Sequence, residues 1–199
     1  MNYSPRAMRQ TICTLLLTFL LISGVESGSA LAGGQVSMMA MERKIERQFK
    51  DVANMTPEQF EILRSERPDD IVLLDVREAN EFAISHLPEA VRVDPGISQA
   101  AFVKAFAGDL KDKTVVLYCS VGYRSSRLAA RVQDSLTKLG VKGVYNLRGG
   151  IFAWHNAGRI VVRDRAETNH IHPYNKTWSR YLEFDHHARY GNQRSWWQW

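Results

Sequence analysis

Two short runs of consecutive apolar residues limit the fold of this chain most strongly. "IVLLDV" at residues 71–76 and "KTVVLYC" at residues 113–119 are rich in aliphatic residues, many of them β-branched, as buried parallel strands are. The second run leads into "RSSRLAARVQDSLTKLG" at residues 124–140, a long helical pattern closed by Gly140. Strands that alternate with helices in this way predict an α/β domain with a mainly parallel sheet flanked by helices.

Weaker signals predict the other elements of the domain. In "MTPEQFEILRS", Thr56 is placed to cap a helix, Pro57 takes its first position and Gln59 completes a capping box. We expect the remaining elements as follows: a loosely packed helix within 33–52, a short helix at 78–83, a short strand at 90–93, a helix at 98–110, a strand and turn at 142–150, and a short helix at 151–158.

The N-terminus has the features of a secretory signal peptide. Arg6 and Arg9 precede a 12-residue apolar segment, "TICTLLLTFLLI" at residues 11–22, which is short for a membrane span. Ala30 and Ala32 match the small-residue cleavage pattern, so we expect cleavage after Ala32 and a periplasmic or secreted protein. A membrane anchor that is kept is the alternative.

The sequence predicts four parts. These are a signal peptide at 1–32, an N-terminal helical extension at 33–52, a single domain at 53–162, and a basic, aromatic tail at 163–199. The net charge of +5 is a mild excess. It suits a small anionic substrate or a membrane surface without requiring either, and we expect no nucleic-acid partner.

The tail suggests two further sites. Its histidines at 170, 172, 186 and 187 could bind a metal, but their spacing offers no third ligand, so we expect no metal site. Its last ten residues, with Trp196, Trp197 and Trp199 beside Arg194, could contact a membrane interface or a partner. Docking of these aromatic residues on the domain is the interpretation we prefer.

Cysteine content directs attention to one residue. The chain has two cysteines, and cleavage after Ala32 would remove Cys13 and leave Cys119 without an internal disulfide partner. Such a cysteine is either a reactive thiol or an inert core residue. Cys119 ends a predicted parallel strand, and ligands bind at the carboxyl ends of the strands in open α/β sheets.

The loop "CSVGYRS" after this strand favours a reactive thiolate. Inward-pointing N–H groups and the N-terminus of the following helix both stabilise negative charge on sulfur. Lowering a thiol pKa from ~8.5 to ~6.5 takes roughly 2.7 kcal/mol, while a helix terminus supplies at most about 2 kcal/mol. Hydrogen bonds from N–H groups, or Arg124, must supply the rest. Gly122 allows the loop to curl, and Ser125 and Ser126 are expected to cap the helix.

The length of the loop discriminates between reactions. Four residues separate Cys119 from Arg124, and Tyr118 precedes the cysteine. Tyrosine-phosphatase loops have five residues in that interval and usually a histidine before the cysteine. The shorter loop makes a smaller cradle, which suits a sulfur atom bonded to cysteine better than a phosphate. This disfavours a cysteine-based phosphatase or arsenate reductase.

Three stretches in order resemble the rhodanese family of sulfurtransferases, in particular its exported single-domain members. They are "LLDVREANEFAISHLPEAVRV" (73–93), "VVLYCSVGYRSSRLA" (115–129) and "YNLRGGIFAW" (145–154). The resemblance implies a single rhodanese-like domain with a mainly parallel five-stranded sheet. It also implies thiosulfate sulfurtransferase activity through a persulfide on Cys119, with no metal or organic cofactor. A non-catalytic binding or sulfur-carrier module is the alternative.

The same resemblance assigns roles to individual residues. Cys119 would be the nucleophile, attacking a small anionic sulfur donor and passing the sulfur to a thiol or to cyanide. Asp75 and Arg77 would lie around the loop, most simply as a structural ion pair, and Glu81 and His86 would be structural. We expect Arg124 to brace the loop through a carboxylate rather than to orient the donor. The substrate-binding loop would comprise Ser120, Val121, Gly122, Tyr123, Arg124 and Ser125.

Overall fold

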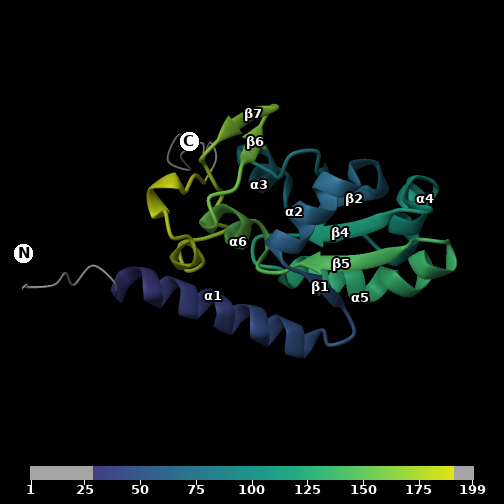
Figure 1. Ribbon diagram of the computed structural model, residues 1–199, viewed down its shortest axis with the longest axis horizontal. Helices are drawn as coiled ribbons and strands as arrows, with labels where there is room; N and C mark the ends of the chain where they lie inside the picture. The colour runs from purple at the N-terminus through teal and green to yellow at the C-terminus, as the bar shows by residue number, and fades with distance from the viewer. Residues whose placement is uncertain (1–28, 191–199) are drawn as a thin grey trace, which may run out of the picture.

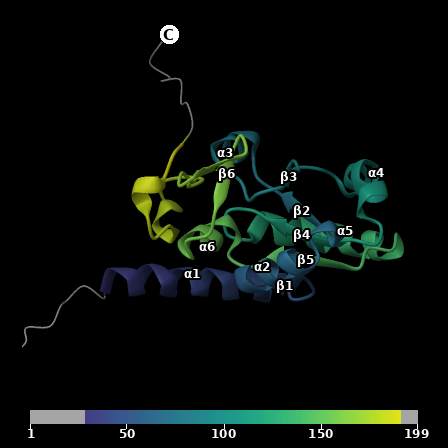
Figure 2. The same cartoon turned by 45° about the horizontal axis from the view of Figure 1, so that its top comes forward.

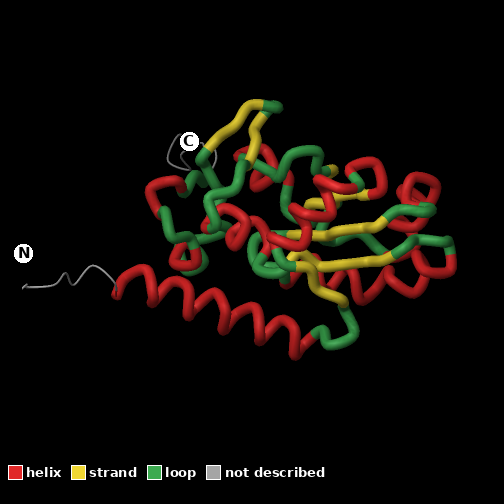
Figure 3. Tube along the Cα trace, in the orientation of Figure 1, coloured by secondary structure: helices red, strands yellow, loops and turns green. Residues whose placement is uncertain are grey.

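A parallel sheet of five strands forms the centre of the computed structural model, which describes residues 29–190 (Figures 1 and 3). Every neighbouring pair in this sheet is parallel, as expected for an α/β domain of this type. Across the sheet the strands are β1 (Ala53–Met55), β5 (Gly143–Leu147), β4 (Thr114–Tyr118), β2 (Ile71–Asp75) and β3 (Val91–Arg92). The sequence did not indicate β1, and β3 is shorter than the predicted 90–93.

Helices cover both faces of the sheet. Helices α4 (Gln99–Leu110) and α5 (Tyr123–Lys138) pack on one face, and α1 (Ser29–Gln48), α2 (Pro57–Glu66) and α6 (Gly150–Asn156) pack on the other. Alternation along β4 explains the two layers, because Val116 and Tyr118 belong to one hydrophobic cluster and Val115 and Leu117 to the other. Helix α3 (Ala79–Ile84) follows β2.

Local sequence signals account for several of these boundaries. The predicted capping box of α2 is confirmed: the Gln59 N–H donates to Thr56 Oγ1 at 3.2 Å, and the Thr56 N–H donates to Gln59 Oε1 at 2.9 Å. Helix α5 buries Leu128, Val132 and Leu136, which are four residues apart and therefore share one face.

The N-terminal helix packs more closely than expected. Helix α1 buries Met38 and Ile45 in the same cluster as α2 and α6, so the prediction of loose packing is wrong. The helix spans the predicted cleavage point after Ala32. The charged and apolar segments of the predicted signal peptide lie outside the described residues. Within residues 29–190, no helix has the combination of length and apolar character that a membrane span requires.

The segment after α6 folds back over the domain. Strands β6 (Val161–Arg163) and β7 (Ala166–Thr168) form an antiparallel hairpin that the sequence did not indicate. Short helical turns η2 (Ser179–Tyr181) and η3 (Asp185–His187) follow. Figures 1 and 2 both show this last segment beside α6 and the first half of α1, and Tyr181 and Leu182 are buried in the shared cluster. The tryptophans predicted to dock at 196, 197 and 199 lie outside the described residues.

Candidate active site

Cys119 lies at the carboxyl end of β4, where the chain turns into α5. The residue is only 1% exposed, and it lies at a cavity of about 90 Å³ that opens to solvent. Of the predicted loop residues, Ser120, Val121, Tyr123 and Arg124 line this cavity with it. The structure therefore brings the nucleophile predicted from the sequence to the carboxyl edge of the sheet, the place where ligands of open α/β sheets bind.

The backbone after Cys119 curls around its sulfur. The Gly122 N–H donates to Cys119 Sγ at 3.2 Å. Gly122 has φ +100°, a left-handed conformation, and a Cβ there would lie 3.1 Å from Asn146 Nδ2. Glycine is favoured here by the backbone conformation, and an added Cβ would also press on the Asn146 side chain behind the loop.

The environment of Cys119 favours the thiolate. Burial of the thiol raises its pKa, but the positive charge of Arg124 and hydrogen bonds from Ser125 and Val121 outweigh burial, so the pKa lies below its ordinary value. A larger thiolate fraction near neutral pH makes Cys119 a better nucleophile than an ordinary buried cysteine. Arg124 and several hydrogen-bond donors stabilise the thiolate together. This agrees with the sequence argument that a helix N-terminus alone is too weak to lower the thiol pKa by about two units.

Helix α6 holds the outer side of the loop. The Ile151 N–H donates to the Cys119 carbonyl at 2.9 Å, and the Phe152 N–H donates to the Ser120 carbonyl at 3.0 Å. Through these two hydrogen bonds, the carbonyls of Cys119 and Ser120 are held against α6. Gly150, with φ +57°, makes this approach possible, because a Cβ there would collide with the Cys119 carbonyl oxygen. The paired glycines in "LRGG" were the sequence signal for this contact.

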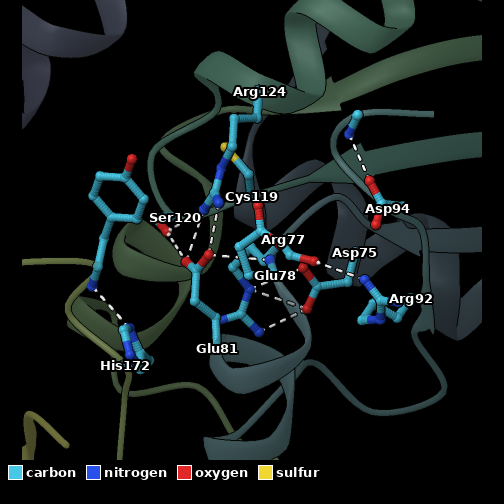
Figure 4. Close-up of polar contacts among 12 residues, drawn as sticks. Asp75, Arg77, Glu78, Glu81, Arg92, Asp94, Cys119, Ser120, Arg124 and His172 are labelled. Atoms are coloured by element: carbon cyan, nitrogen blue, oxygen red, sulfur yellow. Dashed lines mark hydrogen bonds and ion pairs between the residues drawn. The ribbon is translucent and has the colours of Figure 1, made fainter. Parts of the chain in front are cut away.

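Arg124 braces the loop through a carboxylate, as favoured from the sequence. Its guanidinium donates to both oxygens of Glu81, at 2.6 and 2.7 Å, and to Ser120 Oγ at 3.0 Å (Figure 4). The Ser120 hydroxyl in turn donates to Glu81 Oε1 at 3.0 Å. Burial raises the pKa of Glu81, but hydrogen bonds and charge from Arg124 hold it below its ordinary value. The Glu81 carboxylate is therefore charged and ties the loop to α3.

Asp75 and Arg77 form a buried ion pair beneath the loop. Both side chains are fully buried, with Arg77 Nη2 2.6 Å from Asp75 Oδ2 and also donating to the Ser85 carbonyl at 2.6 Å. The Arg77 guanidinium lies 5.7 Å from the centre of the Tyr118 ring, next to Cys119 in the chain. Neither residue lines the cavity, so their position fits the structural role expected of them.

Two serines do not have the role predicted for them. Gly122, not Ser125 or Ser126, occupies the cap position of α5, and no side chain caps this helix end. Ser125 and Ser126 lie buried in the first turn. The Ser125 hydroxyl donates to Asn146 Oδ1 at 2.7 Å, because its position inside the helix points it to β5 rather than to the free N–H groups.

The C-terminal segment supplies the rest of the cavity. Tyr174 and Trp178 line it together with the loop, and the Arg124 guanidinium lies 5.0 Å from the centre of the Tyr174 ring. Sequence reasoning treated this segment as a tail and missed both residues. The stretch "HPYNKTW" was the available signal, but nothing local in it says where it folds.

The histidines of this segment pack against one another and against nearby aromatic residues. In the described part of the chain, no group of three or more histidine, cysteine, aspartate or glutamate side chains is arranged to hold a metal ion. His155 and His187 instead contact each other, with Nε2 and Nδ1 3.1 Å apart. His172 is buried and accepts a hydrogen bond from the Tyr174 N–H at 3.0 Å through Nδ1.

Part of the chain matches a known protein family. The family model described as "Rhodanese-like domain" matches residues 56–157, just over half of the chain. The matched region includes Cys119 and the loop around it. It ends before the segment that contributes Tyr174 and Trp178 to the cavity.

Curated relatives match part of the chain. An uncharacterized protein of Synechocystis, slr1261, is 31% identical over 111 residues, which is 56% of each protein. A tRNA uridine(34) hydroxylase of Burkholderia mallei is 33% identical over 86 residues, 42% of this chain and 27% of that protein. The chain thus spans about half, or less, of the length of these relatives.

Two solved structures show partial similarity to the chain. The BH2092 protein of Bacillus halodurans is 22% identical with a TM-score of 0.46, covering 62% of this chain and 86% of that one. A thiosulfate sulfurtransferase of Pseudomonas aeruginosa is 20% identical with a TM-score of 0.47, covering 69% of this chain and 23% of that one.

Proposed function

Because the chain belongs to the rhodanese-like domain family, we propose that it is a sulfurtransferase that carries sulfane sulfur as a persulfide on Cys119. The observation that carries the proposal is the position of Cys119, a thiol with a lowered pKa enclosed by N–H donors at a solvent-open cavity. An inert core cysteine would have neither the donors nor the cavity.

The reaction has two nucleophilic displacements. In the first, the Cys119 thiolate attacks the outer sulfur of a donor such as thiosulfate, the S–S bond of the donor breaks, and sulfite leaves with the electron pair. In the second, cyanide or a thiolate attacks the terminal sulfur of the persulfide, and the Cys119 thiolate leaves. The enzyme returns to its starting state, which is the pattern of covalent ping-pong catalysis.

The loop can stabilise the persulfide intermediate as well as the Cys119 thiolate. A persulfide carries its negative charge on the terminal sulfur, one bond farther from Cys119 Cβ. The N–H groups of the loop after Cys119, such as that of Gly122, can stabilise this charge, while the carbonyls of Cys119 and Ser120 accept hydrogen bonds from α6. Arg124 adds positive charge beside the loop while its pair with Glu81 fixes the loop's shape.

Thiocyanate formation from thiosulfate and cyanide tests the proposal. The purified protein is compared with Cys119→Ala, and mass spectrometry measures the gain of one sulfur atom on the protein after exposure to the donor. We expect turnover and sulfur loading in the wild type and neither in the variant. A folded wild type that takes up no sulfur from thiosulfate, mercaptopyruvate or organic donors would favour the binding-module alternative.

We further propose that the protein is exported and that its signal peptide is removed after Ala32. The basis is the N-terminal pattern of charged, apolar and small residues alone. Expression of the full chain in a bacterium, followed by fractionation and mass measurement, tests this. Recovery of the uncut chain in the membrane fraction would instead support a retained anchor.

A further inference from the structure

The wall of the cavity opposite the loop is an aromatic strap, defined here as residues 174–178. Both of its ends are fixed. The Tyr174 N–H donates to buried His172, and the Trp178 ring packs 5.7 Å, centre to centre, from the ring of buried Tyr181. The Tyr174 and Trp178 rings lie 5.9 Å apart. The strap is thus anchored to the domain and presents aromatic surface to the cavity in front of Cys119.

The cationic side chain at this cavity, Arg124, already has a carboxylate partner. Arg124 is the one cationic side chain among the described lining residues. Both of its terminal nitrogens donate to the Glu81 carboxylate, and its face lies over the Tyr174 ring. A doubly charged donor would therefore give up its water shell for a cation whose two terminal nitrogens already donate to Glu81 and Ser120.

Apart from Cys119, Ser120 and Arg124, the residues that line the cavity are apolar or aromatic. Val121 and Tyr123 complete the cavity beside the strap, and Tyr123 is held by an edge-to-face contact with Phe49 at 5.4 Å. Aromatic walls of this kind gain most from contact with apolar or aromatic groups. The volume of about 90 Å³ holds a small apolar group, and the cavity is open to solvent, so a larger group could extend out of it.

We propose that this cavity selects sulfane-sulfur donors that carry an apolar organic substituent over the inorganic dianion thiosulfate, and that Tyr174 and Trp178 recognise the substituent. The inference rests on the proposed function and names the substrate class of the same site. A thiosulfonate, R–SO₂–S⁻, has the required chemistry. The Cys119 thiolate attacks its outer sulfur, the S–S bond breaks, and the sulfinate R–SO₂⁻ leaves with the electron pair.

Matched donors test the proposal on the full chain. Thiosulfate, methanethiosulfonate and benzenethiosulfonate are compared by kcat/KM for thiocyanate formation, each divided by its uncatalysed rate with cyanide. We expect the normalised value for benzenethiosulfonate to exceed that for thiosulfate at least ~10-fold, the scale on which apolar pockets discriminate.

Strap variants then locate the selectivity. Tyr174→Ala and Trp178→Ala should each lower kcat/KM for benzenethiosulfonate ~10-fold, mainly through KM, and change thiosulfate less than ~3-fold. Trp178→Phe should restore most of the loss. Phe184→Ala, at another exposed aromatic residue of this segment that does not line the cavity, should leave the ratio unchanged. Because Tyr174 is 46% exposed, we expect Tyr174→Ala to fold even if Trp178→Ala does not, and the selectivity can then be measured on that variant.

Two results would overturn the inference. One is a normalised preference for thiosulfate in the wild type, and the other is an equal fall for all donors in the strap variants. In either case sulfur loading of Cys119 by thiosulfate would leave the proposed function standing. Absence of sulfur on Cys119 with every donor would overturn both.

Discussion

The guanidinium of Arg124 meets the carboxylate of Glu81 through two hydrogen bonds of 2.6 and 2.7 Å, although the residues are 43 positions apart in the chain (Figure 4). Glu81 comes from α3, after β2, and Arg124 from the first turn of α5, after β4. The side chains are 2% and 16% exposed, respectively. The shape of the loop around Cys119 therefore depends on a helix at a different strand.

Glu81→Gln should destabilise the protein. The substitution leaves the charge of Arg124 largely buried and without its carboxylate, which costs about 3 kcal/mol, the lower end for a buried pair, because Arg124 keeps some contact with water. Urea unfolding would show a lower midpoint with an unchanged m-value. Glu66→Gln, at an exposed residue of α2, is the control and should change little. Equal midpoints for the two variants would contradict this account of the pair.

The reactivity of Cys119 should depend on Arg124. Burial raises the pKa of the thiol, while Arg124 and the loop hydrogen bonds lower it below the ordinary value of 9.0. The rate of alkylation by iodoacetamide should thus rise with pH to a midpoint below 9.0. Arg124→Gln should move that midpoint upward. Arg127→Gln, an exposed arginine of the same helix, should not. A midpoint that stays in place in Arg124→Gln would show that the charge has no part in activating the thiol.

Gly150→Ala should impair transfer without touching the donor. A Cβ at this residue would collide with the Cys119 carbonyl and lie 2.8 Å from the Ser120 carbonyl, so the loop must shift. We expect kcat/KM to fall more than ~10-fold, since small displacements of a reacting group cost up to ~100-fold. Gly158→Ala is the matched control, because Gly158 also has positive φ but its added Cβ meets nothing within 4 Å. Similar activity in Gly150→Ala and Gly158→Ala would contradict the prediction that the contact of α6 with the loop positions Cys119.

Stability should fall in mild acid through His155. Burial, together with the charge of His187, lowers the pKa of His155 from 6.5 to about 4. Between these two values the unfolded chain binds a proton that the folded chain does not. The contribution of neutral His155 to the free energy of unfolding is therefore complete above pH 6.5. It declines as the pH falls towards 4.

The slope from this one group approaches about 1.4 kcal/mol per pH unit. Urea unfolding at several pH values measures the slope. His155→Gln should flatten the profile in this interval, because glutamine does not titrate. A profile of equal slope in the variant would assign the acid sensitivity to other groups.

Much of the fold could be predicted from the sequence because its signals are local. The β-branched runs of β2 and β4, the capping box at Thr56 and the four-residue spacing along α5 each act within a few residues. Errors arose where local signals were weak or ambiguous. Strand β1 has three residues and is defined by its pairing with β5. Ser125 is of a residue type that often caps helices, but it lies three residues after the cap position, within the first turn of α5.

The sequence by itself indicated Cys119 as the candidate nucleophile, its strand-end position and the glycine that lets the loop curl, because these depend on neighbours in the chain. Tertiary structure alone decided which carboxylate holds Arg124, which helix supports the loop carbonyls, and that Tyr174 and Trp178 wall the cavity. These are contacts between residues far apart in sequence. They are selected by the packing of whole elements on the sheet, and no local pattern encodes that packing.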